Sequence, residues 1–281
     1  MRKRLIAGLL SAALLAGCGS PPQPPPPTVT VWVTPTPTPE PPPPESPEEQ
    51  GTVREAVDRV IDRYGGEAEV AFFDGEQART AGLVQDAPAW STVKIPIAVA
   101  ALRRDPSLVG AVQTAVRVSD NQAAQQLWLS LGTPEEAGRA TEAILAEAGV
   151  ATAVQAAVTR PEFSSFGQTR WTPQDQVVFA ARLPCLADAE PVLAAMGQIA
   201  AGQDYGLGII PGAHYKGGWG PDPDGRYVVR QFGLVPTDGG QGVSPVALIV
   251  RPASGQYADG QAMLTALAQQ LPDLPAVDCR A

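Results

Sequence analysis

The sequence has 281 residues, 44% hydrophobic and 17% charged, so it is long and apolar enough for a globular domain with a sizeable core. Its formal net charge of −9 argues against a nucleic-acid-binding protein, which would carry a basic patch. One histidine and three cysteines leave too few soft ligands for an ordinary zinc site, and we expect neither a metal nor a cofactor.

The first residues have the composition of an export signal. Residues 1–17 combine a basic start with an apolar run that is too short to span a bilayer as a helix. The sequence Leu15-Ala16-Gly17-Cys18 resembles the lipobox of bacterial lipoproteins, which implies cleavage before Cys18 and lipid attachment to its sulfur. A plain signal peptide with an incidental cysteine is the alternative. The lipobox reading predicts a protein anchored by lipid to the extracytoplasmic face of the bacterial cell membrane.

Residues 18–50 are predicted to form a tether. Of the 30 prolines, 14 fall between Pro21 and Pro47, and proline runs favour the extended, semi-rigid polyproline II conformation. An apolar patch at 29–33 interrupts them and is either a binding strand or incidental. The tether leaves residues 51–281 as the globular domain. There, Cys185 and Cys279 form an even pair that predicts a disulfide in an oxidising compartment, with two buried free thiols as the alternative.

Hydrophobic spacing and capping residues predict the elements of the domain. Helices are expected at residues 53–64, 91–102, 120–131, 133–148, 172–183, 188–200 and 256–271. Strands are expected at residues 69–74, 214–219, 226–234 and 244–250. This order predicts an α/β (α+β) fold, with an antiparallel sheet flanked by the terminal helices and an all-helical subdomain beside it.

Each of the two lysines of the domain has neighbours in sequence that could take part in catalysis or substrate binding. Ser91 precedes Lys94 by three residues, so hydroxyl and amine share a helix face, and a desolvated lysine can accept the proton of a serine nucleophile. This spacing alone is common. Lys216 is followed by Gly217 and Gly218, which would let a substrate backbone lie along the strand, although a solvated lysine beside a glycine turn explains the same residues.

A third element, Ser119-Asp120-Asn121, opens a predicted helix. Ser119 is a candidate proton relay and Asn121 a candidate partner for a substrate amide, whereas helix capping is the structural alternative. Together, Ser-x-x-Lys, Ser-Asp-Asn and Lys-Gly-Gly occur in the order that is typical of class A β-lactamases and penicillin-binding proteins.

The chain therefore resembles the class A β-lactamase family over about residues 53–271. The resemblance implies the serine β-lactamase/transpeptidase-like fold, with an antiparallel sheet and a helical subdomain. It implies Ser91 as the acylated nucleophile, Lys94 as its general base or hydrogen-bond partner, Ser119 as the relay and Asn121 as a substrate contact. A Ser–His triad using His214 is the rival arrangement, but no acid is placed beside that histidine.

The same resemblance assigns the substrate-binding strand. It implies that Lys216 and Arg226 bind a substrate carboxylate, that Gly218 lines the strand edge, and that the N–H groups of Ser91 and Trp219 form the oxyanion hole. Gly217 departs from the family pattern, because a residue with a hydroxyl is expected there.

Two further departures concern the walls of the cleft. The stretch between Lys94 and Ser119 is short for the family. Glu162 is the candidate base for hydrolysis of the acyl-enzyme, but its loop is also short, and a surface glutamate is the alternative. We expect a monomeric serine hydrolase that acts on a β-lactam or on a peptidoglycan-like peptide as a D,D-peptidase. A non-catalytic binding lipoprotein on the same scaffold is the alternative, because fold does not fix function.

Overall fold

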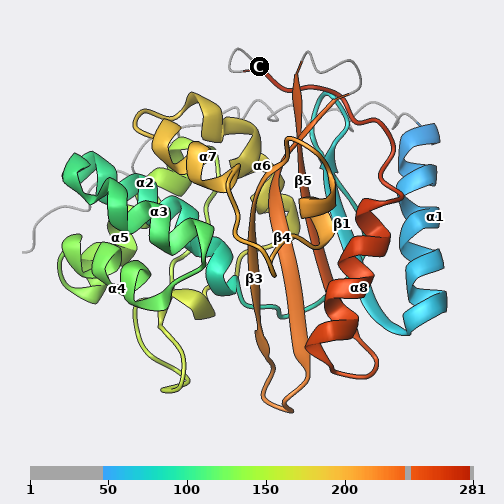
Figure 1. Ribbon diagram of the computed structural model, residues 1–281, viewed down its shortest axis with the longest axis horizontal. Helices are drawn as coiled ribbons and strands as arrows, with labels where there is room; N and C mark the ends of the chain where they lie inside the picture. The colour runs from blue at the N-terminus through green and yellow to red at the C-terminus, as the bar shows by residue number, and fades with distance from the viewer. Residues whose placement is uncertain (1–46, 238–241, 279–281) are drawn as a thin grey trace, which may run out of the picture. The chain divides into compact units, whose positions relative to one another are not determined.

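A five-stranded antiparallel sheet with strand order β2-β1-β5-β4-β3 forms the centre of the domain (Figure 1). The computed structural model describes residues 47–237 and 242–278. The strands are β1 (Gly66–Phe73), β2 (Ala78–Gly82), β3 (His214–Pro221), β4 (Tyr227–Pro236) and β5 (Val243–Pro252). The central strand β5 is buried along nearly its whole length, which explains its continuous apolar sequence.

The terminal helices cover one face of the sheet. Helices α1 (Pro47–Tyr64) and α8 (Tyr257–Ala268) lie side by side there, as the blue and red ribbons in Figure 1 show. Val57 and Leu264 of these helices are fully buried in one apolar cluster with Leu248 of β5. Burying these side chains supplies the hydrophobic stabilisation of this layer.

The opposite face carries helix α6 and, beside it, the helical subdomain. Helix α6 (Pro173–Arg182) packs on β1, β4 and β5. The remaining helices are α2 (Lys94–Arg104), α3 (Val109–Arg117), α4 (Asn121–Ser130), α5 (Pro134–Glu147) and α7 (Glu190–Met196). Helix α2 is buried over most of its length, so it forms the centre of this subdomain.

The predicted fold class is confirmed, and the local signals placed several elements correctly. Thr133 and Glu136 form the expected capping box of α5, with hydrogen bonds of 2.8 and 3.3 Å between each side chain and the other residue's backbone N–H. Thr172 caps α6 in the same way that its Thr-Pro sequence predicts.

Several elements differ from the prediction. Helix α1 begins at Pro47 and not at residue 53, so its first turn lies within the predicted tether. Strand β2 and helix α3 were not predicted: β2 is a short Ala-Arg-Thr-Ala-Gly segment that is held by pairing with β1, and α3 is a short helix between two loops. The predicted helix 91–102 begins as a 3₁₀ turn, η1 (Trp90–Val93), before α2. Helix α7 begins at Glu190 and not at residue 188, because Asp188 has a left-handed φ of 64° that is incompatible with the helix, and it ends at Met196.

No helix in the ranges 47–237 and 242–278 is long and apolar enough to cross a membrane. The predicted signal peptide, Cys18 and most of the predicted tether lie outside the described residues, and so does Cys279. Cys185 is disulfide-bonded, and its pairing with Cys279 stays a prediction.

Candidate active site

Ser91 lies on the tight turn η1, between the sheet and the helical subdomain. The preceding residue, Trp90, is buried and has φ of 50°, a left-handed conformation that is unusual for a bulky residue. The Thr92 N–H and hydroxyl both donate to the Ala89 carbonyl, at 3.1 and 2.5 Å. These contacts fix the turn, so that Ser91 faces a cavity with its side chain only half-buried.

A buried polar network holds this turn from behind. The Arg230 guanidinium on β4 donates to the Pro88 carbonyl at 3.0 Å and, through Nη2, to Gln176 Oε1 at 2.7 Å. Gln176 of α6 in turn donates from Nε2 to Thr92 Oγ1 at 2.9 Å. Burial lowers the pKa of Arg230 to about 9, and the Glu69 carboxylate opposes that shift. The network therefore ties β4, α6 and the Ser91 turn together.

Lys94 projects from the first turn of α2 and is almost fully buried. Its Nζ donates to the carbonyl oxygens of Ser119 and Asp120 at 2.7 and 3.2 Å, and to Asn121 Oδ1 at 2.8 Å. Burial lowers the pKa of Lys94 to about 8, against the opposing charge of Asp120. Within the described ranges no hydrogen bond of Ser91 Oγ is found. The three bonds of Lys94 Nζ all go to the Ser119-Asp120-Asn121 motif.

Ser119 joins the second lysine to the same site. Its φ of 58° is left-handed, and its Oγ accepts from Lys216 Nζ at 2.9 Å. Lys216 has no exposed surface, so the alternative of a solvated strand lysine is wrong. Burial lowers the pKa of Lys216 well below its usual value, and the nearby Lys94 charge adds to the effect. The cap of α4 is Asp120, whose carboxylate accepts from the Ala123 N–H at 2.7 Å.

Strand β3 presents alternate residues to the site. A methyl group at Gly218 would lie 2.9 Å from the Ala89 carbonyl oxygen and 3.0 Å from the Ser91 nitrogen, so only glycine permits this approach. Gly217 and Trp219 lie on the opposite face, where the Trp219 ring packs 5.4 Å from that of Tyr257. A Cβ at Gly217 would lie 3.8 Å from Tyr205 Oη, without a clash. Trp219 nevertheless lines the cavity in front of Ser91.

Glu162 stands on the loop that forms the far wall of the cavity. The Arg160 guanidinium binds the Glu162 carboxylate at 3.1 Å and donates to the Pro221 carbonyl at 2.7 Å, which pins the loop to β3. The Gln168 side chain accepts from the Arg160 N–H at 2.9 Å and donates to the Ser164 carbonyl at 3.1 Å. The loop is thus internally bonded although it is short, and Glu162 remains about half exposed.

The cavity has a volume of about 470 Å³ and brings together most of the predicted residues. Its lining consists of Trp90, Ser91, Lys94, Asn121, Gln125, Glu162, Phe163, Ser164, Phe166, Gly167, Trp219, Gly220, Pro221 and Tyr227. Lys216 and Ser119 lie behind this lining, in contact with each other. Of the aromatic lining residues, Trp219 was predicted for its backbone N–H, whereas the others were not: Trp90, Phe163, Phe166 and Tyr227.

Two other candidates lie apart from the cavity lining. Arg226 is exposed in the turn before β4 and its Nε lies 3.4 Å from Asp222 Oδ2. His214 contacts the Gly212 carbonyl through Nδ1 at 3.1 Å and packs against Gly197 at the end of α7. In the described part of the chain neither residue contacts Ser91, and no group of three or more histidine, cysteine or acidic residues is placed to hold a metal ion.

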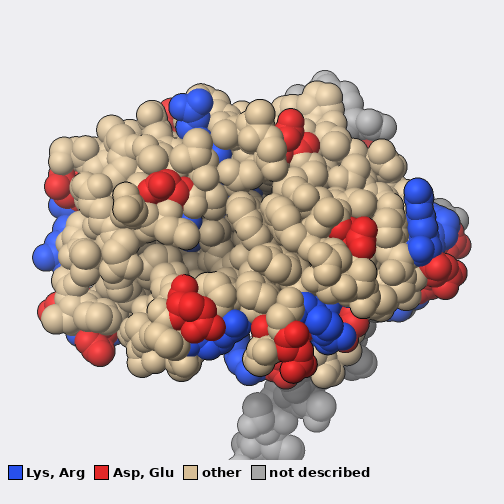
Figure 2. All heavy atoms as spheres, turned by 60° about the horizontal axis from the view of Figure 1, so that its bottom comes forward, with Lys and Arg blue, Asp and Glu red and all other residues tan. Residues whose placement is uncertain are grey.

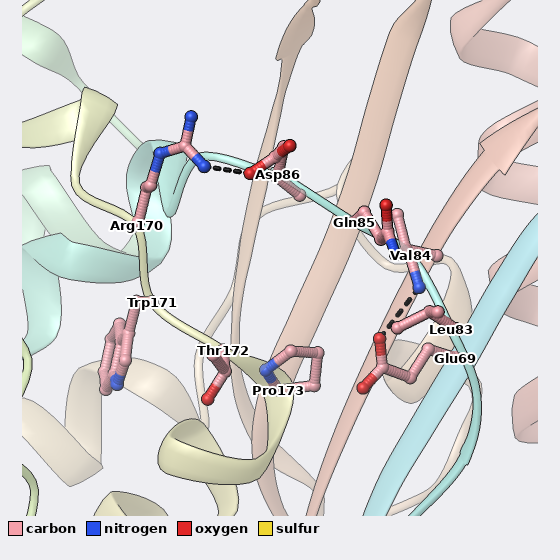
Figure 3. Close-up of a pocket in the computed structure, with 10 residues that line it drawn as sticks. Glu69, Leu83, Val84, Gln85, Asp86, Arg170, Trp171, Thr172 and Pro173 are labelled. Carbon is pink, nitrogen blue, oxygen red and sulfur yellow. Dashed lines mark hydrogen bonds and ion pairs between the residues drawn. The ribbon is translucent and has the colours of Figure 1, made fainter.

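A second cavity of about 360 Å³ lies at the edge of the sheet between residues 83–87 and the start of α6 (Figure 3). Glu69 lines it and accepts from the Val84 N–H at 2.9 Å, and an Arg170–Asp86 ion pair lies at the opposite side of the view. Burial raises the pKa of Glu69, while the Val84 bond and the Arg230 charge oppose the shift. The lining of this second cavity holds neither serine nor lysine among the described residues, so the Ser91 cavity is the candidate active site.

Solved structures of known proteins share the fold of this domain. A class A β-lactamase from Bacteroides cellulosilyticus is 15% identical, with a TM-score of 0.66 over 79% of this chain and 96% of that chain. A β-lactamase from Xanthomonas campestris is 19% identical, with a TM-score of 0.63 over 80% and 98%. A class A β-lactamase from Mycobacterium abscessus is 18% identical, with a TM-score of 0.61 over 78% and 97%.

No protein-family model matches the chain. No curated protein matches it either. At 14–19% identity the structural likeness establishes the fold, and the three motifs occupy one site within it. The domain therefore has the fold of the class A β-lactamases.

Proposed function

We propose that the domain is a penicillin-recognising serine hydrolase that works through an acyl-Ser91 intermediate. One observation carries the proposal: Ser119 is held by both lysines, with Lys94 Nζ 2.7 Å from its carbonyl oxygen and Lys216 Nζ 2.9 Å from its Oγ. The three sequence motifs thus meet at one residue, next to a cavity that Ser91 lines. The β-lactamase names of the structural neighbours support a β-lactam or a related peptide as the substrate class.

In the proposed acylation step, Ser91 Oγ attacks a carbonyl carbon in the cavity. The pKa of about 8 for Lys94 leaves roughly a tenth of the amine neutral at pH 7, which supports a role as the proton acceptor. Ser119 Oγ accepts a hydrogen bond from Lys216, so its own proton is free to pass to the leaving nitrogen. The N–H groups of Ser91 and Trp219 are the proposed donors to the oxyanion, and such donors are commonly worth about 3 kcal/mol.

Hydrolysis of the acyl-enzyme is assigned to Glu162. The carboxylate lines the same cavity as Ser91 and is partly exposed to water, which supports its use as the base for a hydrolytic water. Its ion pair with Arg160 opposes this role, because the guanidinium occupies the Glu162 carboxylate oxygen that a hydrolytic water would have to reach. Both β-lactamase-like and D,D-peptidase-like turnover remain within the proposal.

A second candidate is a non-catalytic binding protein on the same scaffold. The observation that favours it is the position of Lys94 Nζ, which has three oxygen partners at 2.7–3.2 Å, none of them Ser91 Oγ. An ammonium that donates three hydrogen bonds has no lone pair for the serine proton. The two candidates differ in whether a covalent adduct forms.

Anchoring by lipid at Cys18, on the extracytoplasmic side of the cell membrane, is part of the proposal, as is a monomeric state. The lipobox sequence and the proline-rich tether support the anchor.

The test is incubation of the protein with a fluorescent penicillin for several hours, followed by intact mass measurement. We expect an adduct on the wild type and none on Ser91→Ala, because only the hydroxyl can form the ester. A wild type that stays unmodified at saturating probe would favour the binding protein.

A further inference from the structure

We propose that the Ser91 cavity selects esters and amides that carry an aromatic group and no carboxylate. The inference rests on the proposed acyl-serine function and names its substrate class. It follows from the charges and rings that the cavity presents to a ligand. The charges of the cavity differ from those that the sequence motifs imply, because Lys216 and Arg226 were expected to bind a substrate carboxylate.

Neither lysine of the site presents a free ammonium to a ligand in the cavity. Lys216 has no exposed surface, and its Nζ donates to Ser119 Oγ and to the Gly217 carbonyl, both at 2.9 Å. Lys94 lines the cavity, but three oxygens at 2.7–3.2 Å surround its Nζ. A carboxylate in the cavity would have to displace a partner of Lys94 Nζ, and a buried donor left unpaired is costly. It would not meet Lys216, which has no exposed surface and is not part of the described cavity lining.

The neighbouring arginines are also engaged. Arg226 is exposed, pairs with Asp222 at 3.4 Å and is not part of the cavity lining. The Arg160 guanidinium binds Glu162 at 3.1 Å and lies 4.5 Å from the centre of the Phe163 ring. The remaining charge in the lining is the Glu162 carboxylate, which repels an anion. Figure 2 shows a face on which charged side chains gather mainly at the rim and uncharged surface fills the middle.

Aromatic rings make up much of the lining. One group stands beside the serine, where the Trp90 and Phe163 rings meet edge to face at 4.9 Å. The other stands on the sheet, where Tyr257 packs behind Trp219 at 5.4 Å and Tyr227 at 5.7 Å. With Phe166, five of the lining residues are aromatic. Aromatic pairs in offset or edge-to-face contact add about 0.5–1.5 kcal/mol beyond burial of area, so an aromatic ligand group fits this cavity.

The reaction that tests the inference is ring opening of a β-lactam. Ser91 Oγ forms an ester bond with the lactam carbonyl carbon, the carbon–nitrogen bond breaks, and the serine proton ends on the leaving nitrogen. The adduct therefore adds the entire mass of the probe. Methyl esters of penicillins undergo the same step without the negative charge, which isolates the contribution of the carboxylate.

The experiment uses four probes: benzylpenicillin, its methyl ester, and the same two compounds with an acetyl side chain in place of the phenylacetyl group. Adduct formation on the protein is followed by intact mass over time. We expect the methyl ester of benzylpenicillin to acylate Ser91 at least about tenfold faster than benzylpenicillin itself. We also expect it to react faster than the methyl ester of the acetyl analogue. Equal rates for the ester and the acid, or a faster acid, overturn the substrate inference while leaving the acyl-serine function intact. No adduct from any probe overturns both.

A matched pair of variants tests the role of the missing cation. Gln125 and Gln126 are adjacent exposed residues on α4, and only Gln125 lines the Ser91 cavity. We expect Gln125→Arg to speed acylation by the free acid about fivefold relative to the ester, the size of an exposed ion pair. Gln126→Arg should leave the ratio at its wild-type value. If both variants change the ratio equally, long-range charge and not the cavity sets the preference.

Discussion

Replacing Gln176 by leucine tests whether the buried network behind Ser91 supports the fold and the reactive turn. Gln176 is fully buried, accepts from Arg230 Nη2 at 2.7 Å and donates to Thr92 Oγ1 at 2.9 Å. Leucine has a similar volume, so the cavity term is small. The variant leaves a buried guanidinium N–H and a hydroxyl without this partner. One hydrogen bond to a charged group and one neutral bond together correspond to about 3 kcal/mol.

Urea denaturation followed by tryptophan fluorescence measures the loss, since Trp90 and Trp171 are both buried near the network. The matched control is Gln174→Leu on the same helix, where the side chain is exposed and makes a single bond of 3.4 Å to Ala78. We expect the control to change the free energy of unfolding by less than about 0.5 kcal/mol. Equal effects of the two substitutions would refute the reasoning that the network stabilises the domain.

The remaining predictions concern the reactive residues. Burial lowers the pKa of Lys94 to about 8, and only neutral Lys94 can accept the serine proton. The acylation rate should therefore rise up to tenfold per pH unit below pH 8 and level off above it. A rate that does not change between pH 6 and 8 contradicts Lys94 as the base. Glu162→Gln should lengthen the lifetime of the adduct, measured by mass after removal of excess probe, and an unchanged lifetime removes Glu162 from hydrolysis. Gly218→Ala should lower stability by about 1–3 kcal/mol and slow acylation, whereas Gly110→Ala, which meets no atom within 4 Å in α3, should be neutral or stabilising. Intact mass with thiol alkylation, before and after reduction, should find Cys185 and Cys279 protected only before reduction; alkylation of both without reductant contradicts the pairing.

The sequence predicts the parts of the site that depend on chemistry within a short segment. The three motifs lie together in the structure, as their order in the sequence suggests. Lys94 and Lys216 both bind the Ser119-Asp120-Asn121 motif, and Ser91 lines the same cavity as Lys94. Capping signals such as Thr133 with Glu136 also work, because both partners are three residues apart and act within one turn.

The features that escaped prediction depend on contacts distant in sequence. Arg230 lies in a predicted strand, but arginine is rarely fully buried, and its partners at residues 88, 171 and 176 come from other elements. The occupation of Lys216 Nζ by Ser119 Oγ, 97 residues away, likewise cannot be read from local sequence. Strand β2 exists through its pairing with β1, since its own residues have weak strand propensity.

The most direct test of the central claim is peptide mapping by mass spectrometry after reaction with the methyl ester of benzylpenicillin. We expect one modified peptide, with the added mass on Ser91, and no modification of that peptide in Ser91→Ala. Modification at another residue, or an equally modified Ser91→Ala protein, would contradict the assignment of Ser91 as the nucleophile.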